Sequence, residues 1–331
     1  MWKFVGSLLS GLVGIGMSAP VAADTAFGPL VQWHAQHPLK AISGLPAVAA
    51  RHHANGEWQV ALEHASLFMG GQAEDESLFL DGEYSTLSLR HRRSISTCWQ
   101  AEASVPLLFH SGGWADPYIH EWHRIFGLPD AERDAFPESE LHYEWIDGQG
   151  NRRRIDEESS GIGDFQLSVQ RSLGCREQLR GERHRAIARF GLTVPAGDEG
   201  SLRGIGAPTY WSDLQSPVIS PGARYRFAAA VGFLFPGQND QAPAQRKAVL
   251  YGSIGVEARL GSRWSALLQL DAHTSMYDSA LRELGDVGAG LGIGFRFGIN
   301  ARQALEFGFA EDIVVDSTPD IIARLAWRYR H

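Results

Sequence analysis

After its first two dozen residues, the chain has no run of 18 consecutive apolar residues. A helix that crosses a bilayer needs about 20 such residues, so the sequence offers no transmembrane helix. The mean hydropathy of -0.19 also excludes a helical-bundle membrane protein. Basic residues are in deficit, and the formal net charge of -8 argues against a protein that binds nucleic acid.

Familiar chemical motifs are missing as well. The chain has no phosphate-binding loop, no dinucleotide fingerprint and no Cys-x-x-Cys pair, so no cofactor is expected. Residues 288–294 are rich in glycine, but here glycine alternates with apolar residues. That pattern indicates a strand facing a crowded interior rather than a phosphate cradle.

The first residues, 1–23, have the composition of a secretory signal peptide. Lys3 supplies the positive charge, residues 4–17 form the apolar region, and residues 21–23 offer small side chains for cleavage. No cysteine follows the cleavage site, so a lipid anchor is not expected. An exported chain without a helical anchor is periplasmic, secreted or, in a Gram-negative bacterium, inserted in the outer membrane.

The chain is rich in glycine and aromatic residues, with 37 Gly, 10 Trp and 16 Phe. In its last stretch Leu325, Trp327 and Tyr329 alternate with arginine and alanine, and successive side chains of a strand point to opposite faces. One aromatic and one cationic face suit an outer-membrane β-barrel, with the aromatics at the interface and the arginines in the lumen. The candidate lumen arginines are Arg189, Arg296, Arg324 and Arg328.

The same alternation recurs along the chain in segments of roughly ten residues, as in barrel strands. Segments 186–194 and 225–235 would run in the same direction, so a strand of opposite direction is predicted between them, within residues 204–220. The total is then about twelve. We predict a transmembrane antiparallel up-and-down β-barrel over residues 57–331, after a periplasmic segment, 24–56, that can tuck into the barrel mouth. A soluble β-sandwich is the alternative, although its strands are usually shorter, at about five or six residues.

The two cysteines, Cys98 and Cys175, fall near the same end of two strands predicted to be adjacent. In an exported protein a pair of cysteines suggests a disulfide, and neighbouring strands can meet the Cα separation of about 7 Å that a bridge allows. Two free thiols are an equally open alternative.

The longest interruption of the strand pattern covers residues 110–161. Asp116 and Pro117 are suited to begin a helix and Gly127 to end it, so this extracellular loop is predicted to carry a helix. A loop of this length usually serves as a lid, a plug or a binding loop. The candidate constriction residues are Trp114, Asp116, His120, Trp122 and His123.

Three short motifs carry a family resemblance. They are Leu80-Asp81-Gly82-Glu83, His110-Ser111-Gly112-Gly113, and Trp122-His123 followed by Phe126-Gly127-Leu128-Pro129. With the signal peptide and the barrel-like C-terminus, they make the chain resemble the outer-membrane proteins of domain of unknown function 3187. The resemblance implies a fold and a location in the outer membrane, but no activity. The chain departs from the usual pattern at its last residue, since His331 stands where such barrels commonly end in Phe or Trp.

Ser111 beside His110, with Asp116 nearby, raises the hypothesis of a hydrolase. A nucleophilic serine needs a base at hydrogen-bond distance and a third group to orient that base, and sequence neighbours seldom meet this geometry. We therefore favour an ordinary strand-to-loop turn and do not expect an enzyme. His120 and His123 lie one helical turn apart, but they do not match the zinc motif H-E-x-x-H, so no metal site is predicted.

These patterns leave three functions open. The first is a narrow channel for small hydrophilic or anionic solutes, with the long loop as its constriction. The second is a hydrolase of outer-membrane lipid or lipopolysaccharide. The third is a structural or adhesive barrel without transport. The expected partners are lipid, lipopolysaccharide and the barrel assembly machinery, and the oligomeric state is open.

Overall fold

The computed structural model describes most of the region predicted to form the barrel and part of the segment before it. The described residues are 31, 33, 37–46, 56–115, 117–118, 121, 124–125, 139–175, 186–218, 224–238, 244–314, 319 and 321–331. The predicted signal peptide, 1–23, lies outside them.

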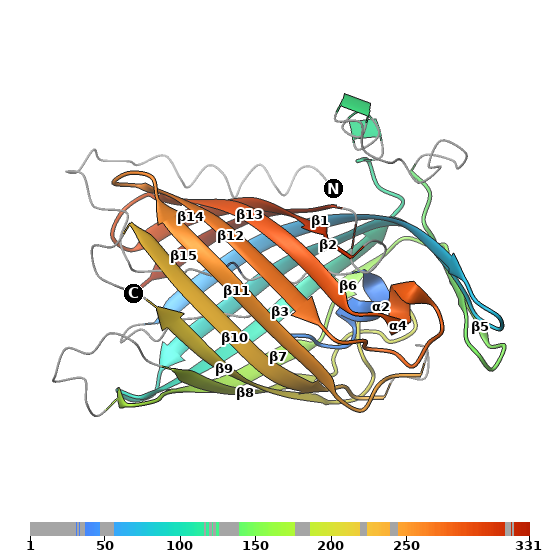
Figure 1. Ribbon diagram of the computed structural model, residues 1–331, viewed down its shortest axis with the longest axis horizontal. Helices are drawn as coiled ribbons and strands as arrows, with labels where there is room; N and C mark the ends of the chain where they lie inside the picture. The colour runs from blue at the N-terminus through green and yellow to red at the C-terminus, as the bar shows by residue number, and fades with distance from the viewer. Residues whose placement is uncertain are drawn as a thin grey trace.

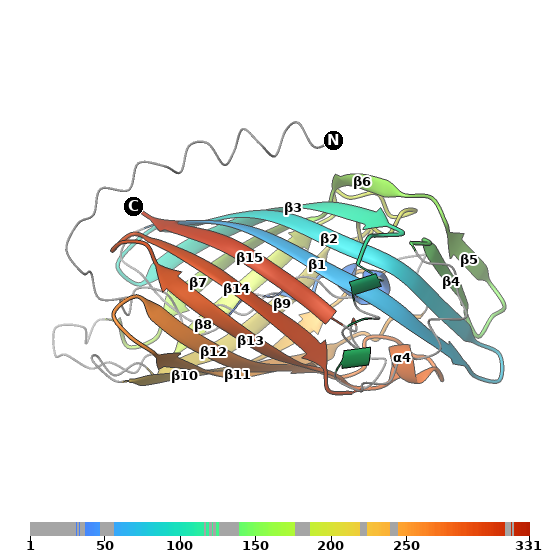
Figure 2. The same ribbon diagram turned by 90° about the horizontal axis from the view of Figure 1, so that it is seen from above.

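Twelve antiparallel strands close into a barrel (Figures 1 and 2). They are β1 (Glu57–Gln72), β2 (Ser77–Ser94), β3 (Trp99–Ser111), β7 (Phe165–Ser172), β8 (Ile187–Val194), β9 (Thr209–Val218), β10 (Tyr225–Phe235), β11 (Val249–Arg259), β12 (Trp264–His273), β13 (Gly288–Gly298), β14 (Gln303–Asp312) and β15 (Ile321–Arg330). The last strand pairs with the first, from Glu57 opposite Arg330 to Ser66 opposite Ile321. The predicted fold is confirmed, and the strand predicted within residues 204–220 is β9.

Three short strands extend this wall at one end. β4 (His142–Ile146) pairs with the start of β2, and β5 (Arg152–Ile155) pairs with β4. β6 (Ser159–Ile162) pairs with the last part of β3, beyond the point where β7 begins. Figure 2 shows β4 and β5 projecting beyond the barrel.

The two ends of the barrel differ in their connections. We call one the short-turn end, because turns 95–98, 260–263 and 299–302 lie there together with Gly56 and His331. We call the other the long-loop end, because the connections from β3 to β7, β8 to β9, β10 to β11 and β12 to β13 begin and end there. A short helix, α4 (Arg282–Gly285), belongs to the last of these loops.

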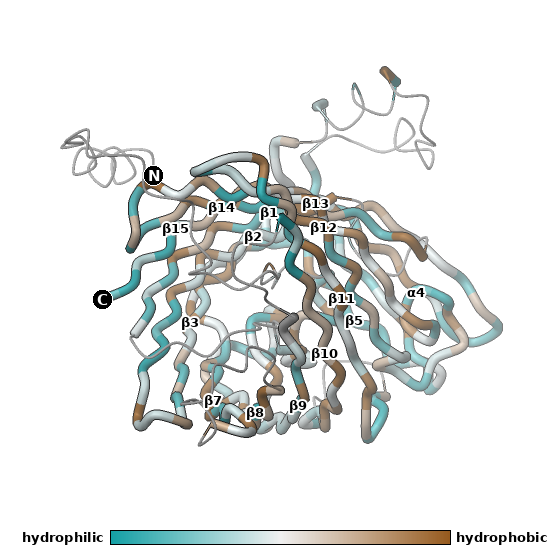
Figure 3. Tube along the Cα trace, turned by 60° about the vertical axis from the view of Figure 1, so that its left-hand side comes forward, coloured by the Kyte–Doolittle hydropathy of each residue, from teal (hydrophilic) through white to brown (hydrophobic). Residues whose placement is uncertain are grey.

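Strict alternation gives every strand two different faces. Along β10, exposed and buried residues alternate through all eleven positions. Exposed positions on the outer wall carry large apolar side chains, such as Leu62, Phe227, Ile293 and Phe309, whereas the inward positions carry Arg, Glu, Asp, Gln and Ser. Figure 3 shows hydrophilic and hydrophobic residues alternating along the strands. The two-residue period of the sequence is therefore the period with which side chains switch between outer wall and lumen.

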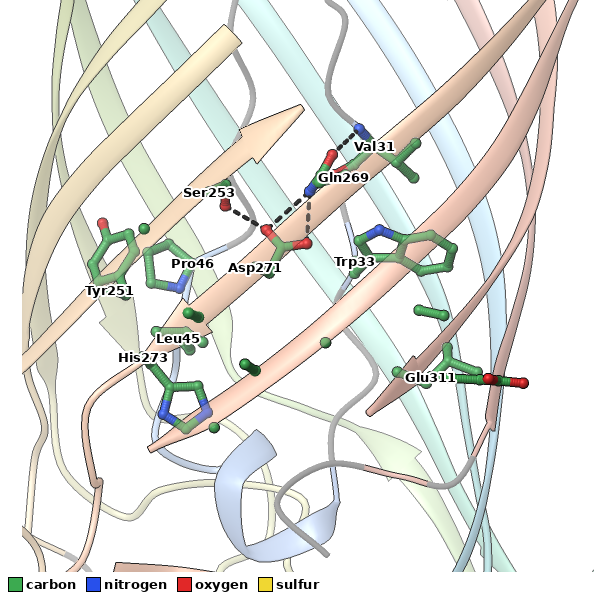
Figure 4. Close-up of a pocket in the computed structure, with 17 residues that line it drawn as sticks. Val31, Trp33, Leu45, Pro46, Tyr251, Ser253, Gln269, Asp271, His273 and Glu311 are labelled. Carbon is green, nitrogen blue, oxygen red and sulfur yellow. Dashed lines mark hydrogen bonds between the residues drawn. The ribbon is translucent and has the colours of Figure 1, made fainter. Parts of the chain in front are cut away.

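The lumen holds part of the chain that precedes the first strand (Figures 1 and 4). We call residues 31, 33 and 37–46 the lumen segment. It contains α2 (Pro38–Ala41), whose residues Leu39 and Lys40 are fully buried. Residues 24–56 were predicted to form a periplasmic segment that can enter the barrel mouth. The lumen segment, which is part of it, lies inside the barrel, and the periplasmic location stays a prediction.

The lumen segment is held by contacts with the inner wall. The Val31 amide donates to the Gln269 side chain at 2.8 Å, and Gln269 donates back to the Val31 carbonyl at 3.0 Å. The Tyr277 hydroxyl donates to the carbonyl of Leu39. Two glycines give the segment room, because a Cβ at Gly292 would lie 2.9 Å from the Trp33 indole and one at Gly308 only 3.3 Å from it.

None of the helices formed by the described residues is long and apolar enough to cross a membrane. The helix predicted to begin at Asp116 falls largely outside the described residues, so it remains a prediction.

Candidate functional site

The inner wall near the short-turn end carries a network of ion pairs centred on Glu306. Its carboxylate lies 2.6 Å from Arg296, 3.2 Å from Arg324 and 2.9 Å from Arg328. All four residues are buried. The register explains the arrangement, because Glu306 of β14 is paired directly with Arg296 of β13 and with Ala326 of β15, which lies between the other two arginines.

Each of these arginines also contacts a second carboxylate. Arg328 lies 2.7 Å from Glu57, Arg324 lies 3.1 Å from Glu63, and Arg296 lies 3.0 Å from Glu257. Glu257 continues the chain of contacts to Arg226. The network includes residues of six strands, β1, β15, β14, β13, β11 and β10. It therefore spans the seam where the last strand of the barrel pairs with the first.

A second network lies on the inward face of β2, β3, β8 and β9. Glu102 lies 2.5 Å from Arg92 and 3.6 Å from Arg90, and Asp213 lies 2.6 Å from Arg189. Asp213 also accepts a hydrogen bond of 2.9 Å from Tyr251. The four arginines predicted for the lumen all occupy inward positions, three of them around Glu306 and Arg189 in this second network.

A cavity of about 80 Å³ remains between the lumen segment and the inner wall (Figure 4). Val31, Trp33 and Pro46 line it from the N-terminal part of the chain, together with Asp271 and His273 of β12. Asp271 accepts hydrogen bonds from Ser253 and from Gln269. This space fits a few water molecules, since each needs about 10–15 Å³ by this measure.

A different constellation lies on the outer wall, at the long-loop end of β1 and β2. His64 and Ser85 are paired directly across these strands, and their side chains share the outward face of Leu62 and Leu87. His64 Nδ1 lies 2.7 Å from Ser85 Oγ, at hydrogen-bond distance. His64 Nε2 lies 3.2 Å from Oε2 of Glu83, two residues before the serine, although the pair lacks the alignment of a hydrogen bond.

The start of the long loop covers this constellation. The amides of Trp114 and Ala115 donate to Glu83 Oε1 at 2.9 and 2.5 Å, and the Trp114 ring stacks on His64 with centroids 5.4 Å apart. Gly113 makes the close approach possible, since its φ is +88° and a Cβ there would lie 1.9 Å from the Glu83 carboxyl carbon. Glu83 is therefore buried on the outer wall, while Ser85 stays partly exposed.

The structure does not bring together the residues of the earlier hydrolase hypothesis. His110 and Ser111 are neighbours in β3, so their side chains point to opposite faces. His110 faces inward, is buried, and packs beside Tyr84 and Tyr143. A Ser111–His110 pair is thus wrong for a physical reason: adjacent positions of a strand cannot share a face.

Trp114 was predicted to line a constriction, and this is corrected as well. Its ring lies over His64 on the outer wall, with 64% of its surface exposed. The other constriction candidates, Asp116, His120, Trp122 and His123, lie outside the described residues and stay predictions. Among the described residues, no group of three or more potential metal ligands comes together.

Cys98 and Cys175 are joined by a disulfide, with their Cα atoms 5.5 Å apart. The bridge ties the turn after β2 to the turn after β7, because β3 and β7 are adjacent in the barrel. Sequence reasoning missed His64, Ser85 and Glu83, although the motif Leu80–Glu83 was noted. The signal was faint, because only the register of β1 and β2 places a histidine beside a serine.

Comparison with solved structures shows the fold. The COG4313 outer membrane channel from Pseudomonas putida F1 is 12% identical with a TM-score of 0.53, covering 85% of this chain and 97% of that one. The P. putida toluene transporter TodX is 10% identical with a TM-score of 0.42, covering 85% and 91%. No curated protein sequence matches the chain.

A model of one protein family matches residues 7–331, nearly the whole sequence. The family is described as "Protein of unknown function (DUF3187)". Its description assigns no activity, so the geometry above is the ground for a functional proposal. This chain belongs to the DUF3187 family.

Proposed function

We propose that the protein is an outer-membrane channel for small hydrophilic solutes, closed by its own lumen segment. The observation that carries the proposal is the division of each strand into an apolar outer position and a polar inner one, around a closed wall. Lipid tails solvate the first kind of surface, and water or a polar solute solvates the second.

The outer wall supports a location in the outer membrane after export by the predicted signal peptide. Aromatic residues gather on it at the short-turn end, where Trp58, Trp99, Tyr225 and Trp264 are exposed. Trp and Tyr favour the boundary between lipid tails and headgroups. We take this end as periplasmic, because barrels of this kind carry short periplasmic turns and longer extracellular loops. Folding by the barrel assembly machinery and contact with lipopolysaccharide are parts of the same proposal.

The charges of the lumen bear on the choice of solute. The inward arginines of both networks are matched by carboxylates within ion-pair distance, as described for Glu306, Glu102 and Asp213. Paired charges largely cancel at the distance of a passing solute. We therefore propose that hydrophilic solutes in general pass, and that a preference for anions, if measured, is weak.

The lumen segment supports a closed resting state. It occupies the lumen beside β12 and β13, and its polar contacts with the wall include Val31 with Gln269, Leu39 with Tyr277 and Ser43 with Met276. A hydrogen bond contributes about 1 kcal/mol net, so we propose that contacts of this kind hold the segment in the lumen but allow its displacement. The segment takes the role that sequence reasoning gave to the long loop.

Conductance in a planar lipid bilayer tests the proposal. The full chain should show small, infrequent openings, and a variant lacking residues 31–46 should show frequent, larger ones. A variant lacking residues 149–151, in the exposed turn between β4 and β5, serves as the control and should behave as the full chain. If the variant without the lumen segment folds, as judged by heat-modifiable gel mobility, and conducts no better, the channel proposal is wrong. A structural or adhesive barrel would then be favoured.

A further inference from the structure

We propose that the outer wall carries a second, catalytic site: a serine hydrolase centre that cleaves ester-linked acyl chains from lipid in the surrounding leaflet. Ser85 is the nucleophile, His64 the general base, and Glu83 the group that positions His64. This inference goes beyond the channel and uses the opposite face of the wall.

The side chains stand in the order that nucleophilic catalysis requires. A serine hydroxyl is a weak nucleophile until a base accepts its proton, and the base needs a third group to fix its orientation and charge. Ser85 Oγ lies 2.7 Å from His64 Nδ1, and Glu83 lies 3.2 Å from the other imidazole nitrogen. For Nδ1 to accept the serine proton, Nε2 must carry the imidazole hydrogen. Glu83 Oε2 lies 3.2 Å from Nε2, within ion-pair distance although without the alignment of a hydrogen bond, so its charge stabilises the imidazolium that forms when Nδ1 takes the proton.

The carboxylate is itself held in place, which separates this group from a chance surface contact. Glu83 is 1% exposed, and two backbone amides of the loop donate to its Oε1. Its second oxygen is left for His64. A carboxylate fixed by backbone amides orients its partner better than one on a mobile chain, because fewer rotamers compete.

The position of the site on the wall selects the class of substrate. Leu62 and Leu87 lie directly below His64 and Ser85 on the same face, with Leu107 and Leu325 on the flanking strands. Above lie Glu83 and the polar loop. The hydroxyl of Ser85 thus stands where an apolar surface meets a polar one, which is the depth of the ester linkage of a membrane lipid.

The long-loop end is extracellular in the orientation proposed above, so the lipid is that of the outer leaflet. Acyl chains in ester linkage occur in lipopolysaccharide and in glycerophospholipid, and the chemistry at the scissile bond is the same for both. The Trp114 ring is stacked on His64 and largely exposed, so it lies at the site where a lipid headgroup would pack.

The reaction takes two steps and consumes one water molecule. First, Ser85 Oγ bonds to the acyl carbon as His64 Nδ1 takes the hydroxyl proton; the ester C–O bond then breaks, and His64 returns that proton to the departing lipid alcohol. Second, water gives a proton to His64 and attacks the acyl-serine. The fatty acid leaves, and the proton on His64 returns to Ser85 Oγ.

Reaction with a long-chain alkyl fluorophosphonate tests the centre without any knowledge of the lipid. Folded full chain in detergent should gain one adduct, which mass spectrometry places on Ser85. Ser85→Ala and His64→Gln should abolish the adduct, and Ser111→Ala should keep it. Ser111 is the matched control, since it lies beside Glu83 on the same face but on the far strand, away from His64. Absence of an adduct on Ser85, or an adduct that persists in His64→Gln, overturns the proposal.

Release of fatty acid tests the substrate class in two arms. One uses vesicles of phosphatidylethanolamine and phosphatidylglycerol, and the other uses purified lipopolysaccharide. Hydrolysis in either arm, reduced about a thousandfold or more in Ser85→Ala, supports the proposal and identifies the source of the acyl chain. No hydrolysis in both arms by protein that is folded by gel mobility contradicts it. Bilayer conductance of Ser85→Ala should be unchanged, so this proposal and the channel fail independently.

Glu83 is a positioning residue, and its test must separate that role from holding the loop. Glu83→Gln keeps an oxygen acceptor for the two loop amides but removes the charge beside His64. The turnover number kcat should fall by about 10²- to 10⁴-fold with KM nearly unchanged. Unchanged kcat would show that Glu83 only anchors the loop and would overturn its assigned role.

Discussion

Two buried carboxylates, Glu306 and Glu83, lie on opposite faces of the same barrel. Glu306 faces the lumen and contacts three guanidinium groups. Glu83 faces outward and contacts one imidazole and two backbone amides. Both are almost fully shielded from solvent, at 2% and 1% exposure, but their partners differ in chemistry.

The difference in partners separates structure from chemistry. Arginine keeps its charge over the physiological pH range and presents its donors in a rigid plane, so the Glu306 network acts as a fixed brace across six strands. Histidine exchanges a proton near neutral pH, and here its other nitrogen reaches a hydroxyl. A buried carboxylate thus supports rigidity on the inner face of the barrel and proton transfer on the outer face.

Removal of Glu306 should have the largest effect on stability. Glu306→Ala leaves three buried arginines short of a counter-charge, and breaking a buried pair in this way costs about 3–5 kcal/mol. Urea titration of the barrel in detergent measures the loss. The matched control is Glu144→Ala, because Glu144 contacts the exposed Arg152 and such pairs are worth about 0–1 kcal/mol. Equal losses of unfolding free energy in the two variants would show that the network stabilises the barrel no more than an exposed ion pair does.

Removal of Glu83 should cost less and act locally. Glu83→Ala deprives the amides of Trp114 and Ala115 of their acceptor, which costs about 1–3 kcal/mol. Hydrogen exchange at these two amides should accelerate, while exchange in β13 and β14 stays as in the parent chain. Glu83→Gln should restore protection. Protection that survives in Glu83→Ala would mean that the loop is held by something else.

The fold was predictable from sequence and the outer site was not, and the reason is physical. The two-residue alternation is present in each strand separately. Leu325, Trp327 and Tyr329 therefore indicate one face of a strand without any knowledge of the neighbouring strands. A site that crosses two strands depends on register, and a shift of one residue between β1 and β2 would separate His64 from Ser85. The partners of the lumen segment were not predicted for a related reason, since Gln269 and Tyr277 lie 238 positions away from the residues that they contact.

The contact of Tyr277 with the lumen segment gives a smaller, functional prediction. Tyr277→Phe removes the hydroxyl that donates to Leu39, at a cost of about 1 kcal/mol to the closed state, so the open fraction should rise about fivefold. Tyr210→Phe is the control, because Tyr210 is an exposed residue of the outer wall. Single-channel recording distinguishes the two variants. An unchanged open fraction in Tyr277→Phe would show that this hydrogen bond does not stabilise the closed state.

The last prediction concerns the dependence of channel opening on pH. Burial lowers the pKa of Lys40, in α2, from 10.5 to about 8. The ammonium form of Lys40 is thus disfavoured in the closed state. Below pH 8 Lys40 is charged in both states, so the closed state carries the full cost of burying the charge. As pH rises from 8 toward the ordinary pKa of 10.5, Lys40 loses its proton in the closed state and this cost falls. Openings should become rarer from about pH 7 to about pH 10. The trend should vanish in Lys40→Met, and openings that become more frequent with rising pH would contradict the sign.

One measurement tests most directly whether the outer wall of the barrel faces lipid and the inner wall does not. Ile254 and Ser253 are adjacent in β11, the first with 58% of its surface exposed on the outer wall and the second inward at 7%. A bimane fluorophore attached to cysteine at each position, in vesicles of brominated-chain phospholipid, reports contact with lipid tails. Strong quenching at position 254 and little at 253 is the predicted result; equal quenching at both, or none at 254, would contradict a lipid-facing outer wall.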